Sequence, residues 1–205
     1  VDVTNYVLVE IGQPMHAFNY NDLADKKIIV RNAREGESIT TLDGKDYALT
    51  TDMLVIADGE KPSCLAGIMG GRESEIEDDT KDLFLESAKF RRDSVRKTGR
   101  ALGIRTEASG RFEKGVDIVN VGFAMDRALQ LICDLDAGDI IEGVLDCNQG
   151  LPEDKILTVK SDSITELLGV QIPEEKMVEI LNSLCLPTTA KNGVLTVRVP
   201  SIRDD

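Results

Sequence analysis

The chain has 205 residues, 41% hydrophobic and 30% charged, so it can bury a core without disulfides and is not disordered by composition. Its 37 acidic and 24 basic side chains give a formal charge of −13, which argues against a general coat for nucleic acid. One histidine and four scattered cysteines without a C-x-x-C pair exclude a zinc site and favour a reducing cytosol. No apolar run is long enough to span a membrane, and no signal peptide is recognisable.

Two features suggest how the chain is organised. It opens at Val1 rather than at Met and stops abruptly at Asp205, so we expect it to be excised from a longer protein. The polar, Gly- and Pro-containing stretch 148–154 separates two periodic segments and predicts a domain boundary. We therefore expect two independently packed domains, 1–149 and 152–205.

The first part begins with strand signals. Residues 27–31, 38–42 and 53–57 predict short strands, and Asp43-Gly44 predicts a hairpin turn. Residues 83–88 form a further strand-like run.

Helix signals follow in the first part. Asp93 or Ser94 can cap a helix that runs to Leu102, and Asp117 can start another that ends near Leu135. Strands followed by helices predict a mixed α+β fold with helices packed on the sheets.

The second part is smaller, with signals for two helices and a strand. Ser161 or Asp162 can cap a short helix that Gly169 ends, and Pro173 can open a second one. The inner face of that second helix is predicted from its spacing, and residues 193–199 alternate like a strand. The inner-face residues are Met177, Ile180, Leu181 and Leu184. Together these elements predict a small winged-helix-like module.

Three signals in the first part could carry chemistry. His16 can take and return a proton near neutral pH, although a lone histidine between Met15 and Ala17 is more often a packed, hydrogen-bonded residue. The glycine-rich segment 67–71 lets backbone N–H groups approach a ligand, or forms only a tight turn. Glu86 interrupts an apolar run, so its carboxylate serves either a functional site or a structural ion pair with a nearby arginine.

Basic residues are concentrated in one segment of this acidic chain. Residues 89–114 hold nine basic and three acidic side chains. Such a strip can bind one defined polyanion, or it can be a solvated face paired with nearby acids. No Ser-His-Asp order is present and His16 is the single possible base for the cysteines, so a covalent nucleophile is unsupported.

Five sequence motifs follow one another along the chain: VTNYV (3–7), GQPMHAF (12–18), AGIMGG (66–71), LESA (85–88) and RTEAS-x-RFE-x-GVD (105–117). Together and in this order they closely resemble the bacterial phenylalanyl-tRNA synthetase beta-subunit family. The resemblance covers the whole chain and implies that residues 1–149 form the editing region, a mixed-sheet, barrel-like domain made of the fused third and fourth domains. It implies that 152–205 form most of the winged-helix-like fifth domain.

In that family the enzyme ligates phenylalanine to tRNA(Phe), and the editing region hydrolyses tRNA(Phe) wrongly charged with tyrosine. A second site is needed because an apolar pocket rejects one added hydroxyl only by about 10²-fold. The resemblance implies that Glu86 accepts the tyrosine hydroxyl, while His16 and the backbone of Gly70 and Gly71 line the pocket.

The resemblance also assigns the hydrolytic step. Thr4, Asn5 and His16 would position the water and the ester near Thr106 and Ala108, without a protein nucleophile or a metal. Whether His16 is a general base or orients the water stays open. Gly110, where many relatives have a larger residue, alters the expected shape of the pocket wall.

Partners and cofactors follow from the same resemblance. We expect Arg96, Arg100 and Arg111 to contact tRNA(Phe). Asp205 stands where the family supplies one magnesium ligand whose partner carboxylates lie further on, so we expect no metal in this chain. Magnesium and ATP belong to the parent enzyme, a cytoplasmic (αβ)₂ assembly with an alpha subunit and no membrane contact.

A different class of function competes with editing. Both domains could form a non-catalytic module that braces the synthetase and contacts tRNA or DNA, which the acidity of the chain favours. The set Asn5, His16, Glu86 and Thr106 favours editing. A freestanding editing-like protein is disfavoured by the attached second domain.

Overall fold

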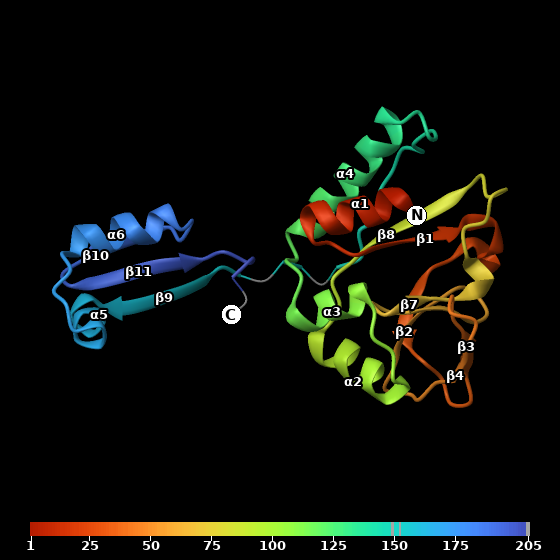
Figure 1. Cartoon of the computed structure of the whole chain (residues 1–205), viewed down its shortest axis with the longest axis horizontal. Coiled ribbons are helices and arrows are strands. Elements are labelled where there is room, and N and C mark those ends of the chain that lie inside the picture. Colours follow the sequence, from red (N-terminus) through yellow and green to blue (C-terminus); the bar gives the residue numbers. More distant parts are fainter. Residues whose placement is uncertain (149, 152, 204–205) are drawn as a thin grey trace. The chain divides into compact units, whose positions relative to one another are not determined.

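The computed structural model describes residues 1–148, 150–151 and 153–203, and it divides into two compact units, 1–144 and 145–205 (Figure 1). The division falls a few residues before the predicted linker. Asp205, the predicted magnesium ligand, lies outside the described residues, as do Gln149 and Pro152 of that linker. The predicted mixed α+β class is confirmed, whereas the barrel-like and winged-helix-like descriptions stay predictions.

Four strands form the main antiparallel sheet of the first unit, in the order β2-β5-β6-β7. The inner strands β5 (Leu54–Ala57) and β6 (Pro62–Leu65) are almost entirely buried, while β2 (Ile29–Asn32) and β7 (Met69–Gly70) flank them. Burial explains the nearly continuous apolar sequence of β5. The strands predicted at 27–31 and 53–57 are therefore confirmed to within two residues.

A hairpin attaches to this sheet. β3 (Ser38–Thr40) and β4 (Asp46–Ala48) pair as predicted around Asp43-Gly44, where Gly44 has a φ of +77°. Thr41 also forms an isolated bridge with Gly71, which ties the hairpin to the end of the main sheet.

A separate two-stranded ribbon joins β1 (Met15–Asn19) to β8 (Leu83–Ser87). Beside it, α1 (Asp2–Ile11) packs along α4 (Asn120–Asp134) (Figure 1). The contact buries Val7 against Ala124 and Ala128, whose small side chains allow close approach. Neither α1 nor β1 is predicted by the sequence pattern.

Two further helices, α2 (Arg92–Leu102) and α3 (Glu107–Lys114), pack against each other. Val95 and Phe112 insert into the main core, and Phe112 meets Phe90 edge-on at 5.1 Å between ring centroids. Short 3-10 turns complete the unit at Tyr20–Asp22, Ala24–Lys26 and Arg72–Ser74.

The predicted helices are confirmed, but their predicted starts are wrong. Arg91 is the N-cap of α2 and neither Asp93 nor Ser94 caps it; the Asp93 carboxylate instead accepts from the Arg91 guanidinium. α4 begins at Asn120, and the Asp117 carboxylate accepts from the Val119 N–H in the turn before it.

The second unit has a three-stranded antiparallel sheet in the order β10-β11-β9, with two helices. Met177, Leu195 and Val197 form its core. The predicted inner face is wrong at Ile180 and Leu184, which are 42% and 57% exposed. Lys160 rather than Ser161 or Asp162 is the N-cap of the first helix. The elements are β9 (Lys155–Lys160), α5 (Ser161–Leu168), α6 (Glu174–Ser183), β10 (Thr188–Lys191) and β11 (Val194–Val199).

The described residues contain neither a membrane-spanning helix nor a metal-binding cluster. None of their helices is long and apolar enough to cross a bilayer. Within the same residues, no three His, Cys, Asp or Glu side chains gather in a way that could hold a metal ion.

The two units predict a defined pattern of limited proteolysis. We expect a nonspecific protease to cut first between residues 145 and 154, because the described side chains of Leu145, Asn148 and Leu151 are exposed and the stretch is polar. Mass spectrometry of the early fragments would locate the cut. First cleavage before residue 145 or after residue 154, with this stretch intact, would contradict the boundary.

Candidate active site

The β1–β8 ribbon places the two most distinctive titratable side chains opposite each other. His16 on β1 is the direct partner of Glu86 on β8 in the antiparallel register. Side chains at directly opposed positions lie on the same face of the ribbon. The pairing therefore brings an imidazole and a carboxyl group to one place.

His16 is held without a hydrogen-bond partner at its outer ring nitrogen. Its Nε2 is buried and unpaired, and its ring packs edge-on against Phe18 with 4.5 Å between ring centroids. Burial lowers the pKa of His16 to about 4 from its ordinary 6.5, since the charged form loses solvation. The imidazole is thus neutral at pH 7, with an unused polar atom.

Glu86, like His16, has a buried polar atom without a hydrogen-bond partner. Its Oε2 is buried and has no hydrogen-bond partner, and burial raises the pKa of the carboxyl group to about 7. No cation contributes to that change, so the structural ion pair that the sequence left open does not account for it. A buried carboxyl group without a donor is costly, which makes it a candidate for ligand binding.

Both side chains line one cavity of about 250 Å³. Most of the site residues predicted from the sequence line the same cavity, although they come from α1, β1, β7, β8 and α3 and the loop before it. They are Thr4, Asn5, His16, Gly70, Glu86, Thr106 and Ala108. The geometry thus gathers these residues, but it does not by itself assign their roles.

Gly70 is in direct contact with the His16 ring. A Cβ atom at position 70 would lie 2.4 Å from Cε1 and 2.7 Å from Nε2 of His16. A side chain there would have to displace the imidazole, so glycine is required for the present arrangement. Gly71 differs, because a Cβ there would lie 2.6 Å from the Ser63 carbonyl oxygen and not against His16. Gly71 lines a second, separate hollow, which is described below.

Thr106 ties α3 to the glycine-rich turn. As the N-cap of α3, its hydroxyl accepts from the Ser109 N–H at 3.0 Å and donates to the Ile68 carbonyl at 2.8 Å. A hydroxyl has one proton to donate, so Thr106 can offer a ligand only an acceptor. Segment 106–115 is therefore α3 with its two caps, and the reciprocal hydrogen bonds between Thr106 and Ser109 stabilise its N-terminus.

Thr4 and Asn5 lie in the first turn of α1. The Thr4 hydroxyl donates to the Val1 carbonyl at 2.8 Å, which leaves its oxygen as an acceptor. Asn5 is exposed at the residue level, yet it lines the cavity. The packing of α1 on α4 holds this turn in place.

Some cavity residues carry no functional signal in the sequence. Leu42, at the tip of the β3–β4 hairpin, lines the cavity and donates its N–H to the Gly70 carbonyl at 3.0 Å. Cys64 also lines it; burial, and secondarily the nearby Glu86, raise the pKa of its thiol, so it is not a thiolate nucleophile. An isolated leucine in a turn and a cysteine in a buried strand look structural in sequence.

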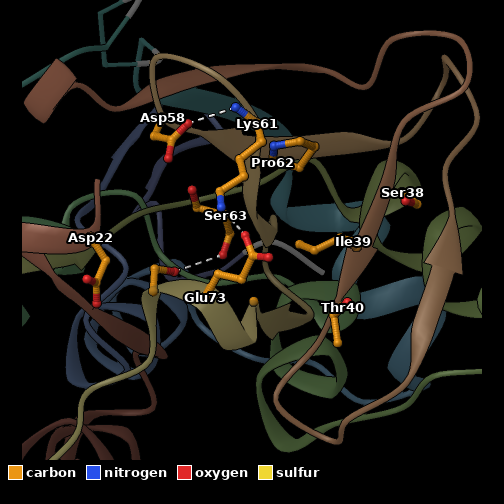
Figure 2. Close-up of a pocket in the computed structure, with 11 residues that line it drawn as sticks. Asp22, Ser38, Ile39, Thr40, Asp58, Lys61, Pro62, Ser63 and Glu73 are labelled. Atoms are coloured by element: carbon orange, nitrogen blue, oxygen red, sulfur yellow. Dashed lines mark hydrogen bonds and ion pairs between the residues drawn. The ribbon is translucent and has the colours of Figure 1, made fainter. Parts of the chain in front are cut away.

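A second hollow, of about 150 Å³, is shown in Figure 2. Its most buried carboxylate, Asp58, accepts from the backbone N–H groups of Glu60, Lys61 and Ala24. Lys61 forms an ion pair with Glu73. The charged groups of this hollow thus have hydrogen-bond or ion-pair partners within the protein, whereas His16 and Glu86 each keep an unpaired polar atom. We therefore regard the second hollow as a structural feature of the surface.

The predicted tRNA-binding arginines differ in their surroundings. Arg96 and Arg100 are exposed on α2, whereas Arg111 on α3 is half-buried and ion-paired with Glu107 at 2.6 Å. Part of the basic segment is therefore paired with nearby acids. Arg96 and Arg100 are the better placed for contact with an external anion.

Comparison with known proteins defines the class. Residues 1–137 match the B3/4 domain family, and residues 157–205 match the tRNA synthetase B5 domain. The chain therefore belongs to the B3/4 domain family, with a B5 domain following.

The particular relatives are phenylalanine–tRNA ligase beta subunits. This chain is 50% identical to that of Carboxydothermus hydrogenoformans and 42% identical to that of Bacillus subtilis, in each case over all of this chain and 26% of the relative. The chain thus spans about a quarter of the length of these relatives. An N-terminal fragment of the phenylalanyl-tRNA synthetase beta subunit from Pyrococcus horikoshii matches with 13% identity and a TM-score of 0.46, over 98% of this chain and 59% of that one.

The unpaired Glu86 predicts a pH-dependent difference in stability. Because the pKa of its carboxyl group is about 7 in the folded state against 4.5 ordinarily, the stability that its bound proton contributes is full below about pH 4.5 and is lost as the pH rises through about 7. Glu86→Gln stays neutral, so its free energy of unfolding relative to the wild type should rise with pH, by at most about 3 kcal/mol at pH 8.

Urea unfolding followed by circular dichroism at pH 5 and pH 8 would measure this difference. Glu75→Gln, at an exposed position, is the matched control and should show no such trend. Equal behaviour of Glu86→Gln and the control would contradict a buried, unpaired Glu86.

Proposed function

We propose that this chain is the editing part of a phenylalanyl-tRNA synthetase beta subunit and that its cavity hydrolyses tyrosine wrongly esterified to tRNA(Phe). The observation that carries the proposal is the pair of buried, unpaired atoms, His16 Nε2 and Glu86 Oε2, beside one cavity of about 250 Å³. The 50% identity to a ligase beta subunit supports the parent enzyme.

Glu86 gives the cavity a reason to prefer tyrosine. A phenol hydroxyl can donate to the carboxyl oxygen, whereas phenylalanine would leave that oxygen unpaired and cut off from water. Leaving a buried polar group unpaired costs about 1–3 kcal/mol, which corresponds to roughly 5- to 150-fold discrimination. This preference is the reverse of the weak one that an apolar pocket can achieve.

His16 is suited to orienting the hydrolytic water. Its unpaired Nε2 can accept a hydrogen bond from the O–H of water, and its pKa of about 4 makes it a weak base at neutral pH. General-base catalysis is most effective when the pKa lies near the working pH. The proposed step is direct attack of this water on the ester carbonyl carbon, which breaks the bond from that carbon to the tRNA ribose oxygen. One of the two water protons ends on the ribose hydroxyl, the other passes to solvent, and the amino acid is released as its carboxylate.

Neighbouring groups complete the proposed reaction site. Thr4 and Thr106 each use their hydroxyl proton within the protein, so their oxygens can only accept, for instance from the substrate ammonium group or the water. The Asn5 amide can donate to the ester carbonyl. Ala108 leaves room for the substrate.

The parent's wider properties are proposed on the same basis. They are a cytoplasmic (αβ)₂ assembly with an alpha subunit, magnesium and ATP at its synthetic site, and tRNA(Phe) as the shared substrate. The alternative, a non-catalytic module that braces the synthetase, leaves the unpaired polar atoms beside the cavity without a purpose.

Glu86 and His16 should have separable roles. Glu86→Ala removes the acceptor, so preference for tyrosyl- over phenylalanyl-tRNA(Phe) should fall by about 5- to 150-fold. His16→Ala should slow tyrosyl-ester hydrolysis by less than the roughly 10²–10⁴-fold that a general base contributes, and it should keep most of the preference.

Deacylation of both aminoacyl-tRNAs by the full-length synthetase and each variant is the measurement. His16→Gln, which keeps a hydrogen-bonding group, should be faster than His16→Ala if the residue orients water. Full preference for tyrosine in Glu86→Ala would contradict the proposed recognition role of Glu86. If the wild-type synthetase hydrolyses neither aminoacyl-tRNA above background, the result would favour the non-catalytic module.

The exposed arginines of α2 predict a salt-dependent contact with tRNA. Arg96→Glu with Arg100→Glu should weaken tRNA(Phe) binding by the synthetase and reduce the slope of affinity against salt, by roughly 1 for each phosphate that is no longer neutralised. Arg34→Glu with Arg72→Glu, exposed and outside the basic segment, is the matched charge control. Equal affinities and equal salt slopes for both double variants would favour the alternative interpretation, in which the basic segment is a solvated face that does not bind tRNA.

A further inference from the structure

Gln13 is a fully buried polar residue just before the strand that carries His16. It is 0% exposed and lies between Gly12, the C-cap of α1, and Pro14, which precedes β1. Its Nε2 donates to the carbonyl of Pro14 at 3.0 Å and to that of Ala88 at 2.8 Å. One amide group therefore joins the start of β1 to the end of β8.

This link replaces a bond that the ribbon cannot make with its own backbone. Met15 pairs with Ser87, so the next pair outward in the same register is Pro14 with Ala88. Proline has no N–H and cannot donate to the ladder. The Gln13 side chain supplies a donor to the Ala88 carbonyl at that point.

The orientation and the cost of the amide support this role. Both neighbours are carbonyl oxygens, so only the NH₂ end can face them. The other end, Oε1, is buried without a hydrogen-bond partner. An apolar side chain of similar size would avoid that cost, so the stabilising contribution of Gln13 lies in its two donated bonds.

The register of this ribbon is not fixed by a connecting turn, unlike that of the two-stranded β3–β4 hairpin, because its strands lie far apart in the sequence. β1 and β8 form a sheet of two strands, with no further strand among the described residues to fix their alignment. A slip of one residue would turn every side chain of a strand to the opposite face. Such a slip would separate His16 from Glu86 and move one of them out of the cavity.

We propose that Gln13 is a positioning residue that fixes the register of β1 on β8 and so holds His16 and Glu86 together beside the cavity. The expected effect of Gln13 on ester hydrolysis rests on the proposed editing function. Its expected effect on the surroundings of the His16 ring does not rest on that function, and it can be measured separately.

The single histidine makes the direct test simple, because its imidazole signals in the NMR spectrum belong to His16 alone. In the 205-residue chain, Gln13→Leu removes both donated bonds while keeping the volume. We expect the His16 pKa to move from about 4 toward 6.5 by one unit or more, as the ring gains access to water. Gln13→Met, longer and more flexible, is the second variant if Gln13→Leu does not fold.

Val95→Ala is the matched control for simple loss of stability. Val95 is buried in the main core on α2 and is 2% exposed, but it belongs to neither ribbon strand. It should lower the thermal unfolding midpoint while leaving the His16 titration unchanged. An unchanged His16 titration in the Gln13 variants, or an equal shift in Val95→Ala, would overturn the proposal.

The kinetic test distinguishes this proposal from the proposed function. In the full-length synthetase, Gln13→Leu should reduce both the rate of tyrosyl-ester hydrolysis and the preference for tyrosine, by about tenfold or more, whereas Val95→Ala should keep the preference. If the wild type does not edit but the NMR shift is found, the proposed function fails and the positioning role stands. If the wild type edits and Gln13→Leu keeps full rate and preference, the positioning role fails alone.

Discussion

The candidate site depends on one constraint, the antiparallel pairing of β1 with β8. These strands lie far apart in sequence and come together as an isolated pair, in a register that sets His16 opposite Glu86. The helices and the main sheet add walls around that pair, through Thr4 on α1, Gly70 on β7 and Thr106 before α3. Without the pairing these walls would surround no buried polar groups.

Carboxylates in this unit show how differently burial can be used. Asp58 is buried but accepts three backbone N–H groups, and Glu37 accepts a bidentate bond from Arg31. These contacts lower the pKa of both groups, although burial opposes them. Glu86 has no such partner at Oε2, and its pKa rises. Asp58 and Glu37 therefore stay ionised because donors satisfy them, whereas Glu86, beside the cavity, keeps a buried oxygen without a donor.

Close backbone approach is the second requirement of the site. The turn at Gly70 touches the His16 ring, and it is fixed from two sides by the Leu42 N–H and the Thr106 hydroxyl, which bind the carbonyls of Gly70 and Ile68. Two segments distant in sequence thus hold one short turn. This bracing keeps the imidazole in place although its Nε2 forms no bond.

The sequence by itself determined the elements whose signals are local. Asp43-Gly44 predicted the hairpin because its turn needs a positive φ. Capping residues predicted the existence of α2, and apolar spacing predicted α4. It also named His16 and Glu86 as a histidine and a carboxylate in unusual surroundings. Only the tertiary structure decided α1, whose β-branched residues resist helix formation until Val7 packs on Ala124 and Ala128. Only it decided that Glu86 lacks a partner and that Gln13 links two strands, because hydrogen bonding between distant segments leaves no periodic pattern along the chain.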